Sequence, residues 1–312
     1  MKAVKNFSVR TVAVVVSFIV FIVSIMSFSR FTADAVYESR AYFKYEAQTG
    51  KRISGYYMLY APENTASTYG LIGTDERVED WSKSGVVKLI TTEVDGNGNP
   101  IDKQDCVTGF VIDKHTIATA AHCVYHFKDK CNYRVDNILF FDKSGNISME
   151  ITDPVEYHVP RQYTTTGLND YDYALITVSQ NLKDYACFNL GYVTDKFIGG
   201  EVSVTGFPRL SDDYYWMKDE EKEEVNKIDQ HKMLTGNGNV TGFTKNGLVK
   251  YTNDTSVGNS GSPVYVTEEL YGKEYYTVIA INVQPGDRTY NAGKRMTPEV
   301  LRFYKGNPNK QY

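Results

Sequence analysis

The stretch Gly258-Asn259-Ser260-Gly261-Ser262-Pro263 decides how the rest of this chain is interpreted. Gly258 permits a tight turn that can direct its own N–H and that of Ser260 at one point. Two such donors would hold the oxyanion that forms when a serine hydroxyl attacks a carbonyl carbon. Gly261 leaves space beside the serine, and Pro263 can begin a strand at a position that needs no ladder donor. Because Gly, Ser and Asn clusters are usually ordinary turns, the stretch indicates a nucleophile only if a base and an acid accompany it.

Composition limits the classes of protein that need to be considered. The chain has 312 residues, of which 42% are hydrophobic, so it can bury a large core. Its 25 Tyr and 15 Phe residues, together with short Val/Ile/Thr runs, favour strands over helices. The net charge of -4 argues against a nucleic-acid partner. No motif in the sequence indicates a cofactor, and we expect none.

The N-terminal segment, residues 1–35, has the organisation of an export signal. Lys2, Lys5 and Arg10 form a positive region, Thr11 to Phe28 is uncharged and mostly apolar, and Ala33-Asp34-Ala35 supplies a small-residue cleavage site. We therefore expect cleavage after this site and a secreted protein. The alternative is an uncleaved anchor at the cell surface, because the apolar run approaches the length that spans a bilayer.

Residues 36–69 are rich in Tyr and have no sustained period, which is consistent with a linker or a propeptide. Residues 70–312 then form the remaining domain, where short strand-like runs are bounded by Gly, Asp, Asn or Pro. These runs are Val86–Thr92, Cys106–Ile112, Thr116–Ala120, Asn137–Phe141, Val155–Val159, Tyr173–Val178, Glu201–Phe207, Gly247–Thr252, Pro263–Thr267 and Tyr275–Val283. Such spacing without intervening helices predicts an all-β barrel or sandwich.

Two segments depart from this pattern. A mixed charge run, residues 218–224, indicates a solvated loop or a short helix. Near the end of the chain, Thr297 as N-cap, Pro298 at the first position and Gly306 past the end predict a C-terminal helix.

A candidate base lies in Thr119-Ala120-Ala121-His122-Cys123, where small residues would let the imidazole pack closely and face Ser260. The competing interpretation is a structural histidine, which we expect for the other histidines of the chain. A metal site is a second alternative, because His122 and His126 are four residues apart. Without the glutamate of an H-E-x-x-H motif, we expect no metal.

The candidate acid is Asp172, at the start of the apolar run Tyr173–Val178. In that place it could be buried and still accept the second N–H of His122, which fixes the tautomer and stabilises the imidazolium. Asp170 is the local competitor, but it lies farther from the strand. The order His122, Asp172, Ser260 along the chain is that of chymotrypsin and differs from subtilisins and α/β-hydrolases.

With these residues in place, the sequence resembles the chymotrypsin-fold glutamyl endopeptidases of bacteria. The similarity extends from about Leu71 to Tyr304. It is carried by Leu71-Ile72-Gly73-Thr74-Asp75-Glu76-Arg77, Asp105-Cys106-Val107-Thr108-Gly109-Phe110, Thr119-Ala120-Ala121-His122-Cys123, Tyr171-Asp172-Tyr173-Ala174, Ser203-Val204-Thr205-Gly206-Phe207-Pro208 and Gly258-Asn259-Ser260-Gly261-Ser262-Pro263.

The resemblance implies two six-stranded antiparallel β-barrels with the site between them. It also implies His122 as general base, Asp172 as its orienting acid and Ser260 as nucleophile, with the N–H groups of Gly258 and Ser260 as the oxyanion hole. It further implies a Cys106–Cys123 disulfide, which would leave Cys131 and Cys187 as the remaining pair.

The same resemblance implies a specificity pocket, and one of its positions departs from the family. Relatives carry a histidine that helps bind the glutamate of the substrate, and Asn282 stands at that position. Thr255 matches the pocket threonine of the family. Asp254, six residues before Ser260, has the spacing of the acid that binds Lys or Arg in trypsin-like enzymes.

Together these features predict a monomeric, secreted serine endopeptidase made as a zymogen, which acts on protein or peptide substrates and cleaves after Glu. The alternatives are cleavage after Lys or Arg, a non-catalytic binding module on a protease fold, and an esterase with the same triad.

Overall fold

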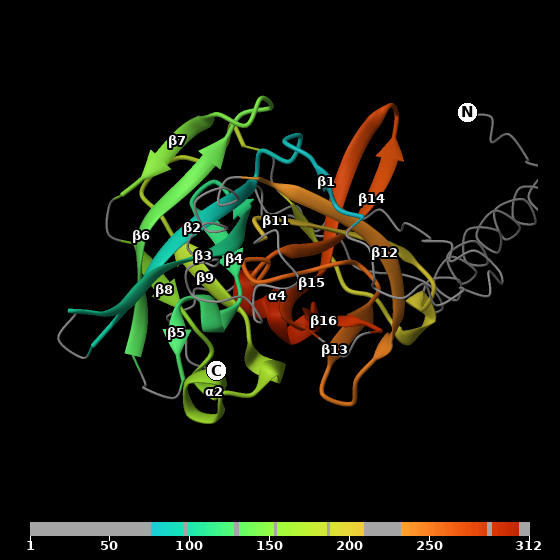
Figure 1. Ribbon diagram of the computed structural model, residues 1–312. Helices are drawn as coiled ribbons and strands as arrows, with labels where there is room; N and C mark the ends of the chain where they lie inside the picture. The colour runs from blue at the N-terminus through green and yellow to red at the C-terminus, as the bar shows by residue number, and fades with distance from the viewer. Residues whose placement is uncertain are drawn as a thin grey trace, which may run out of the picture. The chain divides into compact units, whose positions relative to one another are not determined.

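The strands of this protein form two sheets, which Figure 1 shows in a computed structural model of the chain. The structure describes residues 76–95, 99–127, 131–152, 155–185, 188–208, 232–285 and 289–305. All of these residues belong to one compact unit, Tyr42–Tyr312. The predicted export signal, the segment 36–69 and the charge run 218–224 lie outside the described residues.

The first sheet is antiparallel and has eight strands. They are β2 (Val86–Val94), β3 (Pro100–Asp113), β4 (Thr116–Thr119), β5 (Tyr125–His126), β6 (Cys131–Phe141), β7 (Ile147–Ile151), β8 (Glu156–His158) and β9 (Ala174–Thr177). The pairing order is β5-β6-β2-β3-β4-β9-β8, and β7 pairs with β6. The short end strands β5 and β8 do not pair with each other, so the described strands form a curled, open sheet.

The second sheet also has eight strands, and six of them close into a barrel. They are β1 (Val78–Glu79), β10 (Asn189–Leu190), β11 (Glu201–Gly206), β12 (Leu234–Phe243), β13 (Leu248–Tyr251), β14 (Pro263–Leu270), β15 (Lys273–Pro285) and β16 (Asn291–Arg295). The barrel runs β12-β11-β14-β15-β16-β13 and closes through the pairing of β13 with β12. Strand β1 pairs with β12 at the side of the barrel, and β10 lies parallel to β15.

Every strand-like run predicted from the sequence lies in or overlaps an observed strand, and the all-β class is confirmed. The expected pair of six-stranded barrels is observed as one closed barrel and one curled sheet. The predicted C-terminal helix is α4 (Pro298–Lys305), where the Thr297 hydroxyl accepts a hydrogen bond from the N–H of Val300 at 3.3 Å. Its Val300 and Leu301 side chains are buried, which attaches the helix to the core.

The remaining helical segments are short. They are α2 (Arg161–Thr166) and the 3-10 turns η1 (Ala121–Cys123), η2 (Asn169–Tyr171) and η3 (Asp195–Phe197). No helix of the described ranges has the length and apolar character needed to cross a bilayer.

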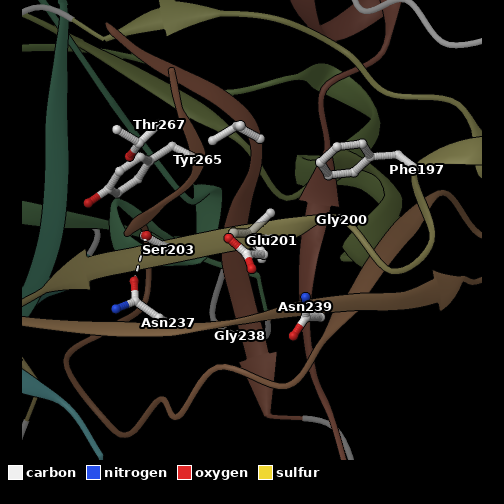
Figure 2. A pocket seen from close by; sticks show the side chains of 11 residues that line it. Phe197, Gly200, Glu201, Ser203, Asn237, Gly238, Asn239, Tyr265 and Thr267 are labelled. Carbon is white, nitrogen blue, oxygen red and sulfur yellow. Dashed lines mark hydrogen bonds between the residues drawn. The ribbon is translucent and has the colours of Figure 1, made fainter. Parts of the chain in front are cut away.

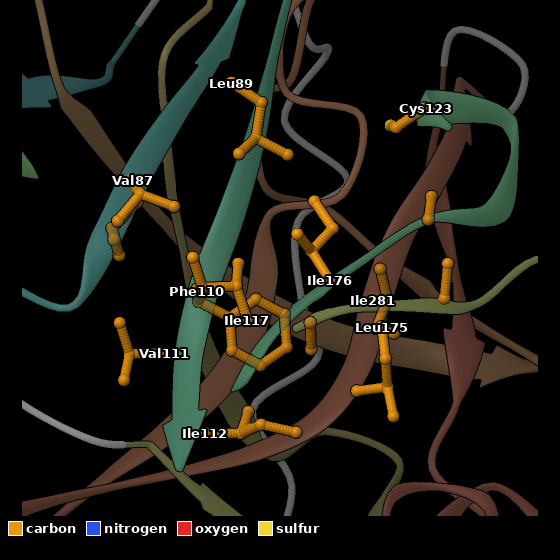
Figure 3. Packing of buried hydrophobic residues seen from close by; sticks show 14 of the residues in the cluster. Val87, Leu89, Phe110, Val111, Ile112, Ile117, Cys123, Leu175, Ile176 and Ile281 are labelled. Atoms are coloured by element: carbon orange, nitrogen blue, oxygen red, sulfur yellow. The ribbon is translucent and has the colours of Figure 1, made fainter. Parts of the chain in front are cut away.

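The largest hydrophobic cluster joins the two sheets. Val87, Leu89 and Phe110 of the first sheet pack in the same cluster as Ile281 of β15 (Figure 3). A smaller cluster of buried side chains, including Tyr251, fills the closed barrel. Because one continuous core holds β4, β9 and β15, the loops at the ends of these strands are fixed with respect to one another.

Candidate active site

His122 and Asp172 are brought together by the pairing of β4 with β9. Thr119, the last residue of β4, is the partner of Ala174, the first residue of β9. His122 lies in turn η1 just after β4, and Asp172 lies just before β9. The antiparallel ladder therefore places the histidine and the aspartate at the same edge of the sheet.

Both oxygens of the Asp172 carboxylate contact His122. The backbone N–H of His122 donates to Oδ1 at 3.0 Å, and ring nitrogen Nδ1 lies 2.7 Å from Oδ2. Asp172 is buried, whereas a third of the His122 side chain is exposed. This contact directs a proton on Nδ1 toward the carboxylate and leaves Nε2 to exchange a proton with a reacting group.

The electrostatic environment favours the charged form of His122. Burial lowers the pKa of the imidazole, but the adjacent Asp172 carboxylate outweighs this effect and raises the pKa well above the usual range of histidine. The site therefore stabilises an imidazolium ion, the species that a general base becomes when it accepts a proton.

The serine-containing loop connects β13 with β14 and depends on two glycines. Gly258 has φ +96°, and a Cβ atom there would lie 2.3 Å from the carbonyl oxygen of Phe207. Gly261 has φ +84°, and a Cβ atom there would lie 2.1 Å from the carbonyl oxygen of Thr108. Neither position can hold a side chain without moving the backbone. Both glycines are therefore required by the close approach of the loop to the rest of the protein.

The same contacts place Ser260 on the side of the first sheet where His122 lies. The N–H of Thr108 donates to the carbonyl oxygen of Ser260 at 2.9 Å. A Cβ atom at Gly261 would lie 2.2 Å from the hydroxyl of Thr119 and 3.2 Å from the N–H nitrogen of Ala120. The loop is thus packed against the residues that lead into η1. Within the described residues, the Ser260 hydroxyl and the His122 ring are not joined by a hydrogen bond, and such contacts commonly tighten only when substrate binds.

Thr108 of β3 connects this loop to both sheets, a role that the sequence did not reveal. Its hydroxyl donates to the carbonyl oxygen of Gly258 at 2.8 Å and accepts from the N–H of Phe207 at 3.0 Å. Its own carbonyl oxygen accepts from the hydroxyl of Thr119 at 2.8 Å. Thr108 is fully buried, so these bonds are shielded from water.

Known proteins identify the fold and the family. The family model described as "Trypsin-like peptidase domain" matches residues 107–272, more than half of the chain. This chain belongs to the trypsin-like peptidase family. The "Extracellular metalloprotease" of Bacillus subtilis is 26% identical over 240 residues, which cover 76% of this chain and 69% of that protein. The "Glutamyl endopeptidase" of Bacillus licheniformis is 23% identical over 200 residues, which cover 62% of this chain and 57% of that protein.

Solved structures agree with this assignment at the level of the fold. A Glu endopeptidase in complex with MPD has a TM-score of 0.57 at 19% identity, and the match covers 77% of this chain and all of that one. The protease Anisep from Arthrobacter nicotinovorans has a TM-score of 0.53 at 14% identity and covers 75% of this chain. The fold is chymotrypsin-like, the resemblance to glutamyl endopeptidases is confirmed, and the chain is a serine endopeptidase.

The candidate specificity residues of this trypsin-like peptidase occupy different environments. Asp254 and Thr255 are half-buried, and Oδ2 of Asp254 accepts a hydrogen bond from the N–H of Glu76 at 3.3 Å. Asn282 is buried, and both ends of its side-chain amide are bonded to the protein, to the carbonyl oxygen of Asn259 and to the hydroxyl of Tyr251. Asn282 is therefore the most deeply buried of the three, and both ends of its side-chain amide are used in contacts with the protein.

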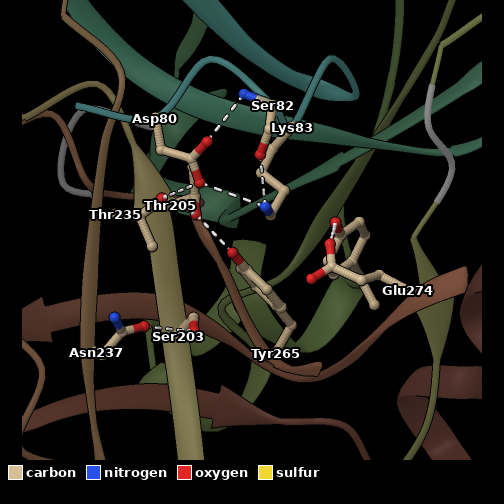
Figure 4. Close-up of polar contacts among 10 residues, drawn as sticks. Asp80, Ser82, Lys83, Ser203, Thr205, Thr235, Asn237, Tyr265 and Glu274 are labelled. Carbon is tan, nitrogen blue, oxygen red and sulfur yellow. Dashed lines mark hydrogen bonds and ion pairs between the residues drawn. The ribbon is translucent and has the colours of Figure 1, made fainter. Parts of the chain in front are cut away.

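The segment 76–83, which we call the N-terminal strap, pairs with β12 of the closed barrel and supports the serine-containing loop. Nη1 of Arg77 donates to the hydroxyl of Ser256 at 2.8 Å and to Oδ1 of Asn259 at 3.3 Å. Farther along the strap, the Asp80 carboxylate accepts from the hydroxyl of Thr235 at 3.2 Å, as Figure 4 shows. The strap is therefore attached to both the barrel wall and the loop.

The cysteines differ from the pairing that the resemblance implied. Cys106 and Cys123 are not joined by a disulfide in the structure. Cys123, the residue after His122, is buried, and its side chain belongs to the apolar cluster shown in Figure 3. The remaining pair of that expectation, Cys131 with Cys187, lies outside what the structure describes, because residue 187 is not among the described residues.

Two further observations separate other features from this site. A cavity of about 720 Å³ opens on the closed barrel (Figure 2). Its lining includes Glu201, Asn237 and Thr267 but no member of the candidate triad. Among the described residues, no three His, Cys, Asp or Glu side chains are grouped as metal ligands. His126 instead places Nδ1 2.8 Å from Oε1 of Glu93.

Proposed function

We propose that this serine endopeptidase cleaves peptide bonds with His122, Asp172 and Ser260 as its catalytic triad. Oγ of Ser260 attacks the scissile carbonyl carbon while Nε2 of His122 takes the hydroxyl proton. The same proton then passes to the leaving amine, which departs as the acyl-enzyme forms. Water attacks the acyl-enzyme in the same way and releases the carboxylic acid product.

The observation that carries this proposal is the two-point contact between His122 and Asp172 at the edge against which the Ser260 loop is packed. A buried carboxylate that holds the backbone and the ring of one histidine fixes both the position and the tautomer of that ring. In the proposal, the N–H groups of Gly258 and Ser260 are the oxyanion donors. The turns at Gly258 and Gly261 set the direction of the loop backbone that carries these two N–H groups.

The test is Ser260→Ala in the full-length chain, with secretion and the thermal unfolding midpoint measured beside peptide hydrolysis. Loss of a triad serine lowers the rate by several powers of ten in comparable enzymes. We expect hydrolysis to disappear while secretion and folding remain at the parent level. A variant that retains more than a few per cent of the parent rate would exclude Ser260 as the nucleophile.

We also propose cleavage after Glu, with weaker selectivity than in the glutamyl endopeptidases. The support is the similarity to those enzymes and the match of Thr255 to their pocket threonine. A substrate carboxylate is bound more strongly by charged donors, about 1.5–3 kcal/mol each, than by neutral ones, about 0.5–1.5 kcal/mol. The amide of Asn282 is neutral and already bonded to Asn259 and Tyr251. Cleavage after Lys or Arg is the second candidate, because Asp254 is half-buried in the loop that also contains Ser260.

The measurement that separates these two specificities is kcat/KM for matched peptides ending in Glu, Gln, Arg and Phe, in the parent and in Asp254→Asn. If the substrate carboxylate is the preferred group, the parent cleaves the Glu peptide best. Asp254→Asn should then have a higher kcat/KM for that peptide, because a repelling charge has been removed. A parent that prefers Arg and loses that preference in the variant would establish the second candidate instead.

We further propose that the enzyme is exported and becomes active after removal of residues up to about Tyr69 or Gly70. The N–H of Glu76 bonds to Asp254, so residue 76 lies beside the candidate pocket. Six extended residues span at most about 20 Å, which brings a new α-amino group within reach of a bound carboxylate. N-terminal sequencing of the secreted form tests the position, and equal activity toward Glu peptides before and after trimming would contradict the role of the new terminus.

A further inference from the structure

Asn282 of β15 makes contacts that do not suit a substrate ligand. Nδ2 donates to the carbonyl oxygen of Asn259 at 2.9 Å, and Oδ1 accepts from the hydroxyl of Tyr251 at 2.5 Å. The carbonyl oxygen of Asn259 can only accept, so the amide end that faces it must be the NH2 group. The Tyr251 hydroxyl must then donate to the other end. The two contacts together determine the orientation of the amide.

The backbone of Asn282 holds the same turn. Its N–H donates to the carbonyl oxygen of Ser262 at 2.9 Å, and its carbonyl oxygen accepts from the N–H of Gly261 at 2.9 Å. Asn282 is 4% exposed and Tyr251 is fully buried, so water does not compete for these hydrogen bonds. One residue of β15 therefore contacts the loop at Asn259, Gly261 and Ser262, on both sides of Ser260.

The contact with Asn259 acts on the peptide unit that Asn259 shares with Ser260. The described backbone contains no cis peptide, so this unit is planar and trans, with its C=O and its N–H pointing in opposite directions. A donor that holds the carbonyl oxygen of Asn259 consequently also fixes the direction of the Ser260 N–H. That N–H is one of the two oxyanion donors in the proposed function.

We propose that Asn282, held by Tyr251, is a positioning residue that aims the Ser260 N–H at the oxyanion. This inference rests on the proposed function and deepens it. It gives Asn282 a different role from the one that the resemblance implies for this position, a ligand of the substrate glutamate. A residue that fixes an oxyanion donor acts on the transition state, so its loss changes kcat, whereas loss of a substrate ligand changes KM as well.

The principal variant is Asn282→Asp, which keeps the shape of the side chain and an acceptor for the Tyr251 hydroxyl. It replaces the donor that faces Asn259 with an oxygen. Removal of a complete oxyanion donor costs about a hundred- to a thousand-fold in kcat, and a misdirected donor retains part of its effect. We expect kcat to fall by roughly thirtyfold or more with KM changed by less than about threefold.

A pair of inhibitors reports on the oxyanion site directly. A peptidyl trifluoromethyl ketone forms a tetrahedral adduct whose oxygen is negative, whereas the corresponding peptidyl alcohol is neutral. In Asn282→Asp the ketone should lose affinity by a factor similar to the fall in kcat, and the alcohol should bind as it does to the parent. Tyr251→Phe removes the bond that orients the amide and should produce the same pattern at a smaller scale, about three- to tenfold.

The matched control is Asn239→Asp, because Nδ2 of Asn239 also donates to a backbone carbonyl, that of Gly199, at 3.1 Å. Asn239 lines the separate cavity of Figure 2. We expect this control to lower the unfolding midpoint and to leave kcat per active site within about twofold, since the cavity that Asn239 lines contains no member of the candidate triad.

Failure of this inference is distinguishable from failure of the proposed function. A parent that does not require Ser260 overturns the proposed triad. A parent that requires Ser260, with an Asn282→Asp variant of unchanged kcat or with a loss confined to KM, overturns only the positioning role. If Asn282→Asp does not fold, Tyr251→Phe decides the question. A Tyr251→Phe variant with the kcat and the inhibitor affinities of the parent would overturn the positioning role of Asn282.

Discussion

The two halves of the candidate site are held in different ways. On the first sheet, one buried carboxylate, that of Asp172, contacts both the backbone N–H and the ring Nδ1 of His122. On the closed barrel, the loop around Ser260 is held mainly by neutral hydrogen bonds from several elements, among them Thr108 of β3 and Asn282 of β15. The base therefore depends on one charged partner, whereas the position of the nucleophile is shared among many weaker contacts.

This difference predicts how each half responds to substitution. Charge-assisted hydrogen bonds are about twice as strong as neutral ones, and loss of the Asp172 charge also alters the proton on His122. Removal of one of the hydrogen bonds that hold the serine-containing loop leaves the others in place. Each such substitution should therefore lower the activity of the enzyme only in part. The following substitutions examine this contrast in order of decreasing effect.

The largest effect is expected for Asp172→Asn. The amide cannot accept the Nδ1 proton in the same way, so the ring takes the wrong tautomer, and comparable enzymes lose about ten-thousand-fold in kcat. The pH dependence should change as well, because the carboxylate raises the pKa of His122 in the parent. Only the neutral imidazole can act as base, so kcat/KM of the parent rises with pH through this raised pKa. In the variant the midpoint of the residual activity should move to lower pH.

Asp170→Asn is the control for that substitution, since Asp170 lies in the neighbouring turn η2 and does not contact His122. It should keep the parent kcat/KM within about twofold. The contrast between the two halves would be lost if Asp172→Asn fell by less than a hundredfold, or if its pH midpoint stayed where the parent has it.

An intermediate effect is expected for Thr108→Val, which keeps the shape of the side chain and removes its hydroxyl. The carbonyl of Gly258 and the N–H of Phe207 each lose a buried partner, and an unsatisfied buried group costs about 1–3 kcal/mol. The loop remains held by its other contacts, so kcat/KM should fall by about ten- to a hundredfold and the unfolding midpoint should drop. Urea denaturation and peptide hydrolysis measure the two effects separately.

Thr277→Val provides the matched control for the loss of a threonine hydroxyl. Thr277 is buried in β15 of the closed barrel, and its hydroxyl has no hydrogen-bond partner among the described residues. Its replacement should be neutral or stabilising, because an unsatisfied polar group is removed. Equal losses of stability in the two threonine variants would show that the hydrogen bonds of the Thr108 hydroxyl do not hold the serine-containing loop.

The same contrast explains which features the sequence could predict. The candidate residues His122 and Asp172 follow from local patterns, because each lies at the end of a recognisable apolar strand that pairs with the other. Strand β12 was missed because its Leu234–Phe243 sequence is rich in Gly and Asn, which normally indicate a turn. In the barrel Gly238 is required, since a Cβ atom there would lie 2.6 Å from the backbone nitrogen of Asn253.

The clamps on the serine-containing loop could not be predicted for a related reason. Thr108 and Tyr251 contact residues more than twenty positions away in the chain, and their hydroxyls leave no local pattern. Asn282 was assigned to the pocket by its position in the resemblance, and only the direction of its amide distinguishes a clamp from a ligand. Tertiary contacts, rather than periodicity or spacing, determine these roles.

The smallest effect is expected for Arg77→Met, at the strap. The guanidinium of Arg77 donates to Ser256 and Asn259, so it supports the loop through side chains that Asn282 does not contact. These bonds are charge-assisted, but Arg77 is only half-buried, so solvent screening reduces their contribution to about 1 kcal/mol, which corresponds to roughly a fivefold fall in kcat/KM. Arg77→Lys can still donate one hydrogen bond and should recover part of the loss. The control is Arg295→Met, whose guanidinium bonds to Val193 and Asp195, outside the serine-containing loop, and which should affect stability alone. If Arg77→Met lost as much activity as Asp172→Asn, the loop would depend on one cation, as the base depends on one carboxylate, and the contrast between the halves would be wrong.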